Sequence, residues 1–245
     1  YTLWHTLSLH DALPIYLETM SVLIVDDMQS MRRTVRNMFK QLGLGRAIRH
    51  AENGEEAWSL LQSTPVDLAV VDWNMPVLNG VELLNRIREN REIRDMPVIM
   101  ITAESEKDIV VEVAESEIDA YLLKPLTMKA LDAKVRQVVE NANNPDEVTQ
   151  CLYTARDLEE AGNYKEAIEQ VKQALTKRPN ASRILRKMAD LHFKIDKENV
   201  AEKCLKKAVA VNKDDAVARY QLGDLYRKKN DLDNANRYFM EAVSI

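Results

Sequence analysis

The residues with the clearest chemical potential are three carboxylates, a threonine and a lysine, each placed directly after a short apolar run. Asp26 and Asp27 follow VLIV, Asp72 follows LAVV, Thr102 follows VIMI, and Lys124 follows YLL. Continuously apolar runs of this length are typical of parallel strands that are covered on both faces. The carboxyl ends of such strands share one edge of the sheet, where ligands bind. We therefore expect these five side chains to lie together at that edge.

Three carboxylates gathered at one place repel one another, and burial raises the cost of keeping them charged. A hard divalent cation with oxygen ligands removes that cost. Mg²⁺ suits the set, because it keeps several water molecules and takes one or two carboxylates plus phosphate oxygens. A simpler interpretation is that Asp26 and Asp27 only cap a helix over residues 28–42. A cap alone would not require Lys124 and Thr102 at the same edge.

The elements that must position these residues alternate regularly from Ser21 onward. Apolar runs recur roughly every 20–25 residues, and helical patterns separate them. Thr127 is placed to cap one of the helices. Two apolar stripes have helical spacing: Met31, Val35, Met38, Phe39 and Leu42, and then Leu131, Val135, Val138 and Val139. The pattern predicts an α/β fold, a (βα)5 doubly wound parallel sheet.

The second half of the chain reads as helix only, and it repeats itself. Residues 141–146 form a polar linker that contains a proline. Beyond it, small residues recur with a constant step of 34 positions, as in Ala155/Ala189/Gly223, Ala167/Ala201/Ala235 and Ala174/Ala208/Ala242. A fixed 34-residue phase predicts paired antiparallel helices that approach closely.

Composition excludes several classes of protein. The chain has 245 residues, 46 % of them apolar and 30 % charged, with a net charge of −5. There is no overall basic excess for nucleic acid, and no apolar run approaches the ~18 residues of a membrane span. The two cysteines, Cys151 and Cys204, have no metal-ligand neighbours, which fits a reducing, cytoplasmic setting. P-loop, nucleophile-elbow and zinc motifs are absent from the sequence.

Residues 1–19 are expected to be a non-native or disordered leader. The segment TLSLHDALPI resembles translated sequencing-adapter DNA, and the natural start is expected at Met20. The alternative is a genuine flexible extension. At the other end, the chain stops inside a helix without a polar capping helix, so the natural protein is expected to continue.

Residues 21–140 resemble the CheY-like receiver domain of response regulators. The resemblance rests on VLIVDDMQSMRRTVRNMF, VVDWNMPVLNGVELL, PVIMITAE and YLLKPLT, and is nearest to the chemotaxis subgroup. It implies the flavodoxin/CheY-like fold, with Asp72 as the nucleophile that accepts a phosphoryl group from a histidine kinase. It also implies that Asp26 or Asp27, Asp72 and the backbone carbonyl of Asn74 bind Mg²⁺.

The same resemblance assigns roles to the other strand-end residues. Thr102 would bond the phosphoryl oxygens, Lys124 would pair with the phosphate, and Tyr121 would turn inward as Thr102 moves. Asn74 together with Glu104 resembles the members that lose phosphate rapidly. The surface from Lys107 to Val139 is the expected coupling surface.

Residues 148–245 resemble about three tetratricopeptide (TPR) repeats, an all-α solenoid, with Gly162-Asn163-Tyr164 and Pro179 at the expected turn and repeat boundary. Such arrays bind peptides in a groove lined by the first helix of each repeat. Carrying the groove positions over suggests a mildly basic surface for an acidic segment or a C-terminal carboxylate. An equally good interpretation is a set of solvated helix faces. The suggested groove residues are Arg156, Arg183, Arg186, Lys194, Tyr220, Arg227 and Lys228, with Asp190 and Asp224 among them.

The sequence therefore predicts a receiver over 20–141, a linker over 142–147 and TPR repeats over 148–245. The function expected is that of a response regulator in a two-component phosphorelay. A sensor histidine kinase or phosphotransfer protein would be one partner and an unknown protein or peptide bound by the repeats another, without nucleic acid or membrane. It would not be an enzyme beyond its own phosphorylation and dephosphorylation. Alternatives are a constitutive TPR scaffold with an idle receiver, or a phosphatase-like enzyme with an Asp nucleophile.

Overall fold

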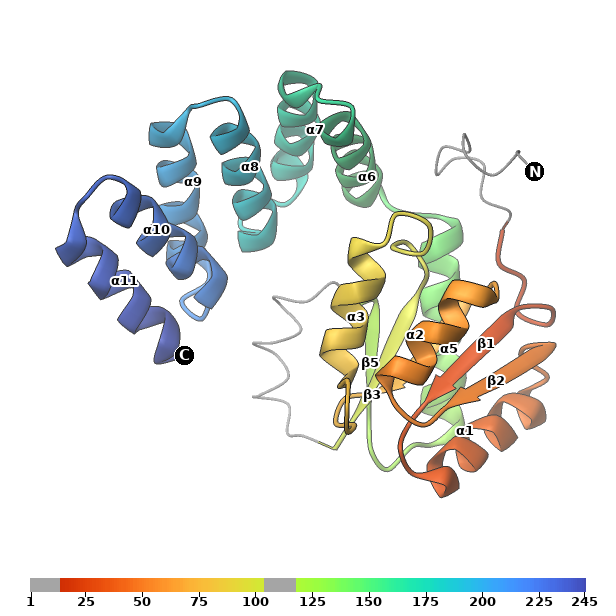
Figure 1. Ribbon diagram of the computed structural model, residues 1–245. Helices are drawn as coiled ribbons and strands as arrows, with labels where there is room; N and C mark the ends of the chain where they lie inside the picture. The colour runs from red at the N-terminus through yellow and green to blue at the C-terminus, as the bar shows by residue number, and fades with distance from the viewer. Residues whose placement is uncertain (1–13, 104–117) are drawn as a thin grey trace. The chain divides into compact units, whose positions relative to one another are not determined.

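The computed structural model of the chain describes residues 14–103 and 118–245, and these form two compact units (Figure 1). The first unit runs from Tyr1 to Asn144 and the second from Pro145 to Ile245. The last helix of the first unit ends at Asn143 and the first helix of the second begins at Glu147. The boundary thus falls inside the stretch 142–147 that the sequence suggests as a linker.

The first unit is built on a five-stranded sheet with all described pairings parallel, in the order β2-β1-β3-β4-β5. This order, with strands added on both sides of β1, is that of a doubly wound sheet and confirms the predicted fold class. The strands are β1 (Ser21–Val25), β2 (Ala47–Ala51), β3 (Leu68–Asp72), β4 (Val98–Thr102) and β5 (Ala120–Leu123).

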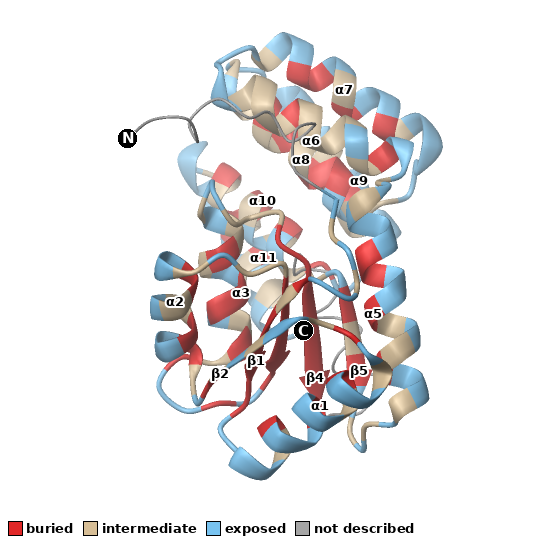
Figure 2. Cartoon of the chain, turned by 90° about the vertical axis from the view of Figure 1, so that its right-hand side faces the viewer, coloured by how far each residue is buried: buried red, intermediate tan, exposed pale blue. Residues whose placement is uncertain are grey.

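Helices cover both faces of the sheet, which explains why the strands are apolar throughout. Every residue of β3 and β4 is buried (Figure 2). One core cluster joins the sheet to α1 and α5, and a second, on the opposite face, joins it to α2 and α3. The helices are α1 (Gln29–Leu42), α2 (Gly54–Ser63), α3 (Gly80–Glu89) and α5 (Met128–Asn143).

Side-chain caps fix where these helices begin. Asn53 accepts the backbone N–H of Glu56 at the start of α2, and Asn79 forms a capping box with Glu82 at the start of α3. Thr127 accepts the N–H of Ala130, which confirms the predicted cap of α5.

The start of α3 lies very close to the end of β3. A Cβ atom placed on Gly80 would be 2.3 Å from the carbonyl oxygen of Asp72 and 2.7 Å from Cε of Met100. The N–H of Gly80 also donates to the carbonyl of Trp73 (3.0 Å). Only glycine allows this approach, so Gly80 helps to fix the backbone at Asp72.

Within the first unit, residues 14–19 are tied to α5 and to the first core cluster. Ile15 exchanges two hydrogen bonds with the Asn143 side chain (2.8 and 2.9 Å), and Ile15 and Leu17 pack against the first core cluster. The expectation of a disordered leader over residues 1–19 therefore does not describe residues 14–19, because Ile15 and Leu17 pack against buried apolar side chains. Residues 1–13 lie outside the described part of the chain.

The second unit consists of three antiparallel helix pairs. Buried small residues lie where paired helices meet, as the 34-residue phase predicts; a Cβ on Gly223 would be 2.6 Å from the ring of Phe239. The helices are α6 (Glu147–Glu160), α7 (Tyr164–Lys177), α8 (Ser182–Lys194), α9 (Glu198–Val211), α10 (Ala216–Lys228) and α11 (Leu232–Val243).

The turn inside each pair uses one residue with left-handed backbone. Gly162, Asp196 and Asn230 have φ values of 78°, 56° and 59°, and they are equivalent positions of the repeat. Asp and Asn are the non-glycine residues that tolerate this conformation best. The turns at Asp196 and Asn230 can therefore form without the glycine found at position 162. Across residues 14–103 and 118–245, none of the helices has the length and apolar character needed to cross a membrane.

We predict that Gly80→Ala destabilises the first unit by about 2–3 kcal/mol, because the added methyl overlaps the Asp72 carbonyl and cannot be accommodated without a backbone shift. Urea unfolding followed by tryptophan fluorescence measures this, since Trp58 and Trp73 lie in the described part of the first unit and residues 145–245 contain no tryptophan. Gly43→Ala is the control: its Cβ would meet no atom within 4 Å, so only the left-handed backbone (φ 68°) costs energy, about 1 kcal/mol. A Gly80→Ala midpoint equal to wild type would contradict the close approach.

Candidate functional site

The strand-end residues meet at the carboxyl edge of the sheet, as their spacing suggests. Asp72 is the last residue of β3 and pairs in register with Ile101, one residue before Thr102. Val25 pairs with Val71, which brings Asp26 level with Asp72 on neighbouring strands. Lys124 directly follows β5.

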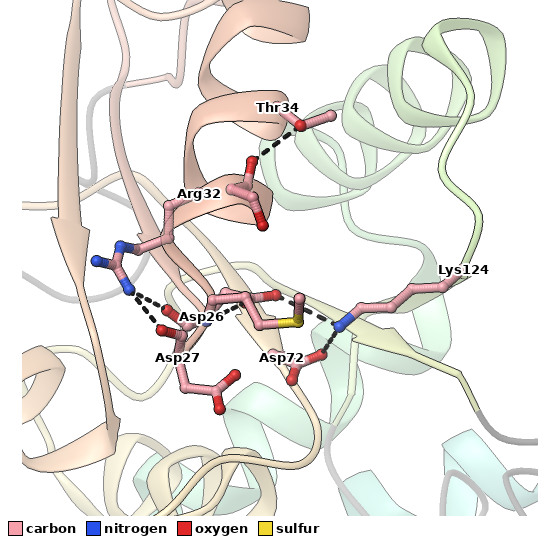
Figure 3. Close-up of polar contacts among 8 residues, drawn as sticks. Asp26, Asp27, Arg32, Thr34, Asp72 and Lys124 are labelled. Carbon is pink, nitrogen blue, oxygen red and sulfur yellow. Dashed lines mark hydrogen bonds and ion pairs between the residues drawn. The ribbon is translucent and has the colours of Figure 1, made fainter.

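Lys124, which follows β5, forms ion pairs with acidic residues at the ends of β1 and β3. Its ammonium nitrogen lies 2.6 Å from Oδ1 of Asp72 and 3.4 Å from Oδ2 of Asp26 (Figure 3). The two carboxylates are 7 % and 1 % exposed, whereas the Lys124 side chain is 20 % exposed. One lysine thus offsets two buried carboxylates on adjacent strands, each of which would be costly to bury alone.

The three carboxylates have a geometry that fits a divalent cation. One oxygen from each of Asp26, Asp27 and Asp72 can be chosen so that all lie within 4.8 Å of one another. Mg²⁺ holds oxygen ligands at ~2.0–2.1 Å and keeps bound water, so oxygens at this spacing can share an ion directly or through water. Asp27 is exposed, which leaves the site open on one side. The donor set therefore fits Mg²⁺.

Burial and ion pairing act against each other on the charges at this edge. Burial raises the pKa of Asp72, and the neighbouring Asp26 adds to this, while the hydrogen bond from Lys124 opposes it. For Lys124, burial disfavours the charged form, but the bonds to Asp72 and Asp26 outweigh it and raise its pKa. The lysine therefore remains charged, and the Asp72 carboxylate is held at a cost.

Three other predicted residues lie around this cluster with different exposure. Thr102 is buried at the end of β4, and Asn74 is exposed in the β3–α3 loop. Tyr121 of β5 is half-buried and packs against the second core cluster. Glu104, and most of the part of the predicted coupling surface that precedes β5, lie outside the described residues.

Arg32 contacts the acidic loop, although the sequence analysis assigned it no role. Its Nη1 donates to the carbonyl oxygens of Asp26 (2.7 Å) and Asp27 (3.0 Å) (Figure 3). Its Nη2 lies 2.5 Å from Oε1 of Glu52. A signal was available, because Arg32 has helical spacing with the buried Val35 and Phe39 of α1. A charged residue on an apolar stripe needs a buried partner.

The candidate groove residues of the repeats are largely engaged within the chain. Arg227 and Lys228 lie 2.6 and 2.7 Å from the carboxylate of Asp224, and Lys194 lies 2.8 Å from Glu159. Their positive charge is therefore partly neutralised before any partner binds.

Arg186 differs from the other candidate groove residues because it is buried. Its side chain is only 10 % exposed, and its Nε lies 3.4 Å from Oδ2 of Asp215, the buried cap of α10. This ion pair joins α8 to the start of α10. Arg183 and Tyr220 are exposed. The centroids of the Tyr220 and Phe239 rings lie 5.4 Å apart.

Comparison with known proteins identifies the first unit. Residues 22–136 match the response regulator receiver domain. The chain is 36 % identical to the chemotaxis protein CheY of Pseudomonas aeruginosa over 124 residues, 51 % of this chain and 99 % of that protein. The chain belongs to the response regulator receiver family. It is also 37 % identical to CheY-3 of Vibrio cholerae over 123 residues, 50 % of this chain and 94 % of that protein.

The repeats and a solved structure add to these findings. Residues 158–216 and 216–245 match tetratricopeptide repeats, so the receiver is followed by TPR repeats in one chain. The solved structure of CheY4 from Vibrio cholerae is 28 % identical, with a TM-score of 0.46, and the match covers 49 % of this chain and 98 % of that one. The relatives thus span the receiver half only.

We predict that Asp72→Asn makes the receiver more stable than wild type at pH 7 in chelator-containing buffer. Because burial raises the pKa of Asp72, the folded state binds its proton more tightly than the unfolded state does, and wild type loses stability as the pH rises through the folded pKa. The amide keeps an acceptor for Lys124 but has no charge to bury. The difference should shrink as the pH falls toward about 4, the unfolded pKa of Asp.

Urea unfolding from pH 4 to 8 measures this difference. The matched control is Asp132→Asn on α5, which removes a carboxylate outside the cluster and should show no such pH-dependent gain. A gain for Asp72→Asn that was equal at pH 4 and pH 7 would show that charge burial is not its cause.

Proposed function

We propose that the receiver accepts a phosphoryl group on Asp72 from a sensor histidine kinase or phosphotransfer protein, and that this change controls the TPR repeats as a protein-binding output. The observation that carries the proposal is the contact of Lys124 with Asp72 (2.6 Å) beside two further carboxylates. Together they provide a nucleophile, a fixed positive charge and a cation site at one sheet edge. A scaffold with an idle receiver would not need all three.

Mg²⁺ would be held by Asp26, Asp27 and Asp72, with the backbone carbonyl of Asn74 as a further ligand. When bound, it would neutralise the charge that gathers on the phosphoryl oxygens during transfer. It would also offset the repulsion among the three carboxylates, which Lys124 alone offsets for Asp26 and Asp72.

In the transfer step, a carboxylate oxygen of Asp72 attacks the phosphorus of the donor's phosphohistidine. The new O–P bond forms as the P–N bond breaks, and the electron pair of that bond returns to the imidazole nitrogen. Lys124 is already placed to pair with the developing charge, so little reorganisation is needed. The product is an aspartyl phosphate on Asp72.

The switch would follow from the new charge on Asp72. Its oxygens are strong acceptors, and Thr102, at the end of the neighbouring strand, carries a hydroxyl that can donate to them. Tyr121 lies half-buried on β5, and Met100 of β4 pairs in register with it. Movement of Thr102 would then open space for the Tyr121 ring, a shift between two packings.

We predict that a small acyl phosphate with Mg²⁺ adds one phosphoryl group to the wild-type chain and none to Asp72→Asn, because the amide cannot act as the nucleophile. Intact-mass spectrometry checks this, and Lys124→Met should reduce labelling strongly by removing the fixed charge. Asp132→Asn is the matched control and should label as wild type does. Labelling of Asp72→Asn at the wild-type level would defeat the proposal.

We further predict that phosphorylation changes the amide hydrogen exchange of residues 145–245, since the repeats are the proposed output. Wild type is compared with and without acyl phosphate, and Asp72→Asn receives the same treatment as the control. The change should appear only in the phosphorylated wild type. If labelling succeeds but exchange in 145–245 stays the same, the receiver does not act on the repeats, and that half of the proposal fails.

A further inference from the structure

Arg32 is a charged side chain in an apolar setting. It is 7 % exposed, and its neighbours on the same face of α1 are the fully buried Val35 and Phe39. Burying an arginine is costly unless its donors are satisfied. The groups that accept hydrogen bonds from the guanidinium therefore indicate the role of Arg32.

The guanidinium is held mainly by the backbone of the acidic loop. One nitrogen, Nη1, donates to the carbonyl oxygens of both Asp26 and Asp27, and the other, Nη2, bonds to the carboxylate of Glu52 after β2. In Figure 3, Arg32 and Lys124 reach the Asp26–Asp27 segment from opposite sides. Lys124 contacts a carboxylate of that segment, whereas Arg32 contacts its peptide groups.

Two further bonds make this loop a connected unit. The N–H of Asp26 donates to the carbonyl of Ala51 (3.3 Å), and the N–H of Met28 donates to Oδ1 of Asp26 (2.9 Å). The orientation of the two peptide groups fixes the directions in which the Asp26 and Asp27 side chains leave the backbone. Fixing the carbonyls therefore also aims the carboxylates toward Asp72.

We propose that Arg32 is a positioning residue for the divalent-cation site: by linking the carbonyls of Asp26 and Asp27 to Glu52, it holds the loop in the conformation that binds the ion. This inference rests on the proposed function, because it concerns the same Mg²⁺ site. Outer-shell groups that orient metal ligands typically contribute 10–100-fold to metal affinity.

The positive charge of Arg32 would weaken Mg²⁺ binding, whereas its hydrogen bonds to the loop would strengthen it. A positive guanidinium near a cation site repels the ion, so charge alone predicts tighter Mg²⁺ binding once Arg32 is replaced. Glu52 offsets part of that charge, although its side chain is 67 % exposed and well solvated. The sign of the change on replacement therefore separates positioning from charge.

A lysine at position 32 distinguishes the positioning explanation from the charge explanation in a second way. Arginine presents several donors in a rigid planar fork, whereas lysine carries the same charge on one nitrogen at the end of a flexible stem. Lysine at position 32 cannot reach two carbonyls and Glu52 with fixed geometry. If positioning matters, Arg32→Lys behaves as a loss; if charge matters, it behaves as wild type.

The test is Mg²⁺ binding by isothermal titration calorimetry, without any phosphodonor. We expect Arg32→Gln and Arg32→Lys both to bind Mg²⁺ at least about tenfold more weakly than wild type. Glu52→Gln keeps an acceptor for Nη2 and should remain near wild type. The matched control is Arg33→Gln, since Arg33 is the exposed neighbour and should not change Mg²⁺ affinity.

A second measurement reads the loop without metal. Amide exchange at Met28 reports its bond to Oδ1 of Asp26, and it should be faster in both Arg32 variants than in Arg33→Gln. Circular dichroism checks that each variant is folded. If the Arg32 variants do not fold, Glu52→Ala takes their place: it removes the Nη2 partner from an exposed side chain and should weaken Mg²⁺ binding and speed Met28 exchange.

The outcomes are distinct. Wild-type affinity in Arg32→Lys, or tighter binding in Arg32→Gln, would overturn the positioning role in favour of charge. Unchanged affinity in both variants would overturn it altogether while leaving the proposed function intact. If wild type itself bound no Mg²⁺, the proposed cation site and this inference would fail together.

Discussion

The ion pair between Lys124 and the carboxylates of Asp72 and Asp26 is the interaction on which the functional edge depends. The two acids are nearly fully buried on neighbouring strands, and each would be unfavourable there alone. The lysine follows β5, which β3 and β4 separate from β1, so it can offset both acids only when these four strands have paired in this order. The arrangement of the acidic edge thus depends on the pairing of strands that are distant in the sequence.

The site is supported by backbone placement as much as by charge. Gly80 lets α3 begin against the carbonyl of Asp72, and the guanidinium of Arg32 holds the carbonyls of Asp26 and Asp27. Both contacts involve peptide groups beside the acids rather than the carboxylates themselves. The acidic groups therefore lie on a backbone that is held by contacts from α1 and from α3.

The repeats use charge in another way. Arg186–Asp215 and Lys194–Glu159 join α8 to the start of α10 and to α6, and they neutralise part of the positive charge of α8. The side chains of Arg183 and Tyr220 are exposed. Part of the positive charge of the repeats is therefore neutralised within the chain.

The sequence by itself determined the architecture of both units. Continuous apolar runs with helical stripes between them are set by local spacing, and so are the cap at Thr127 and the 34-residue phase of small residues. It also placed Asp26, Asp72, Thr102 and Lys124 at one edge, because strand ends of a parallel sheet must meet. Only the tertiary structure decided which charges pair. Arg186 and Asp215 are distant in the sequence, so their contact depends on how the repeats pack. Arg32 is close in the sequence to Asp26 and Asp27, but its contact with their carbonyl oxygens depends on how the loop turns between β1 and α1. No local pattern of residues encodes either pairing.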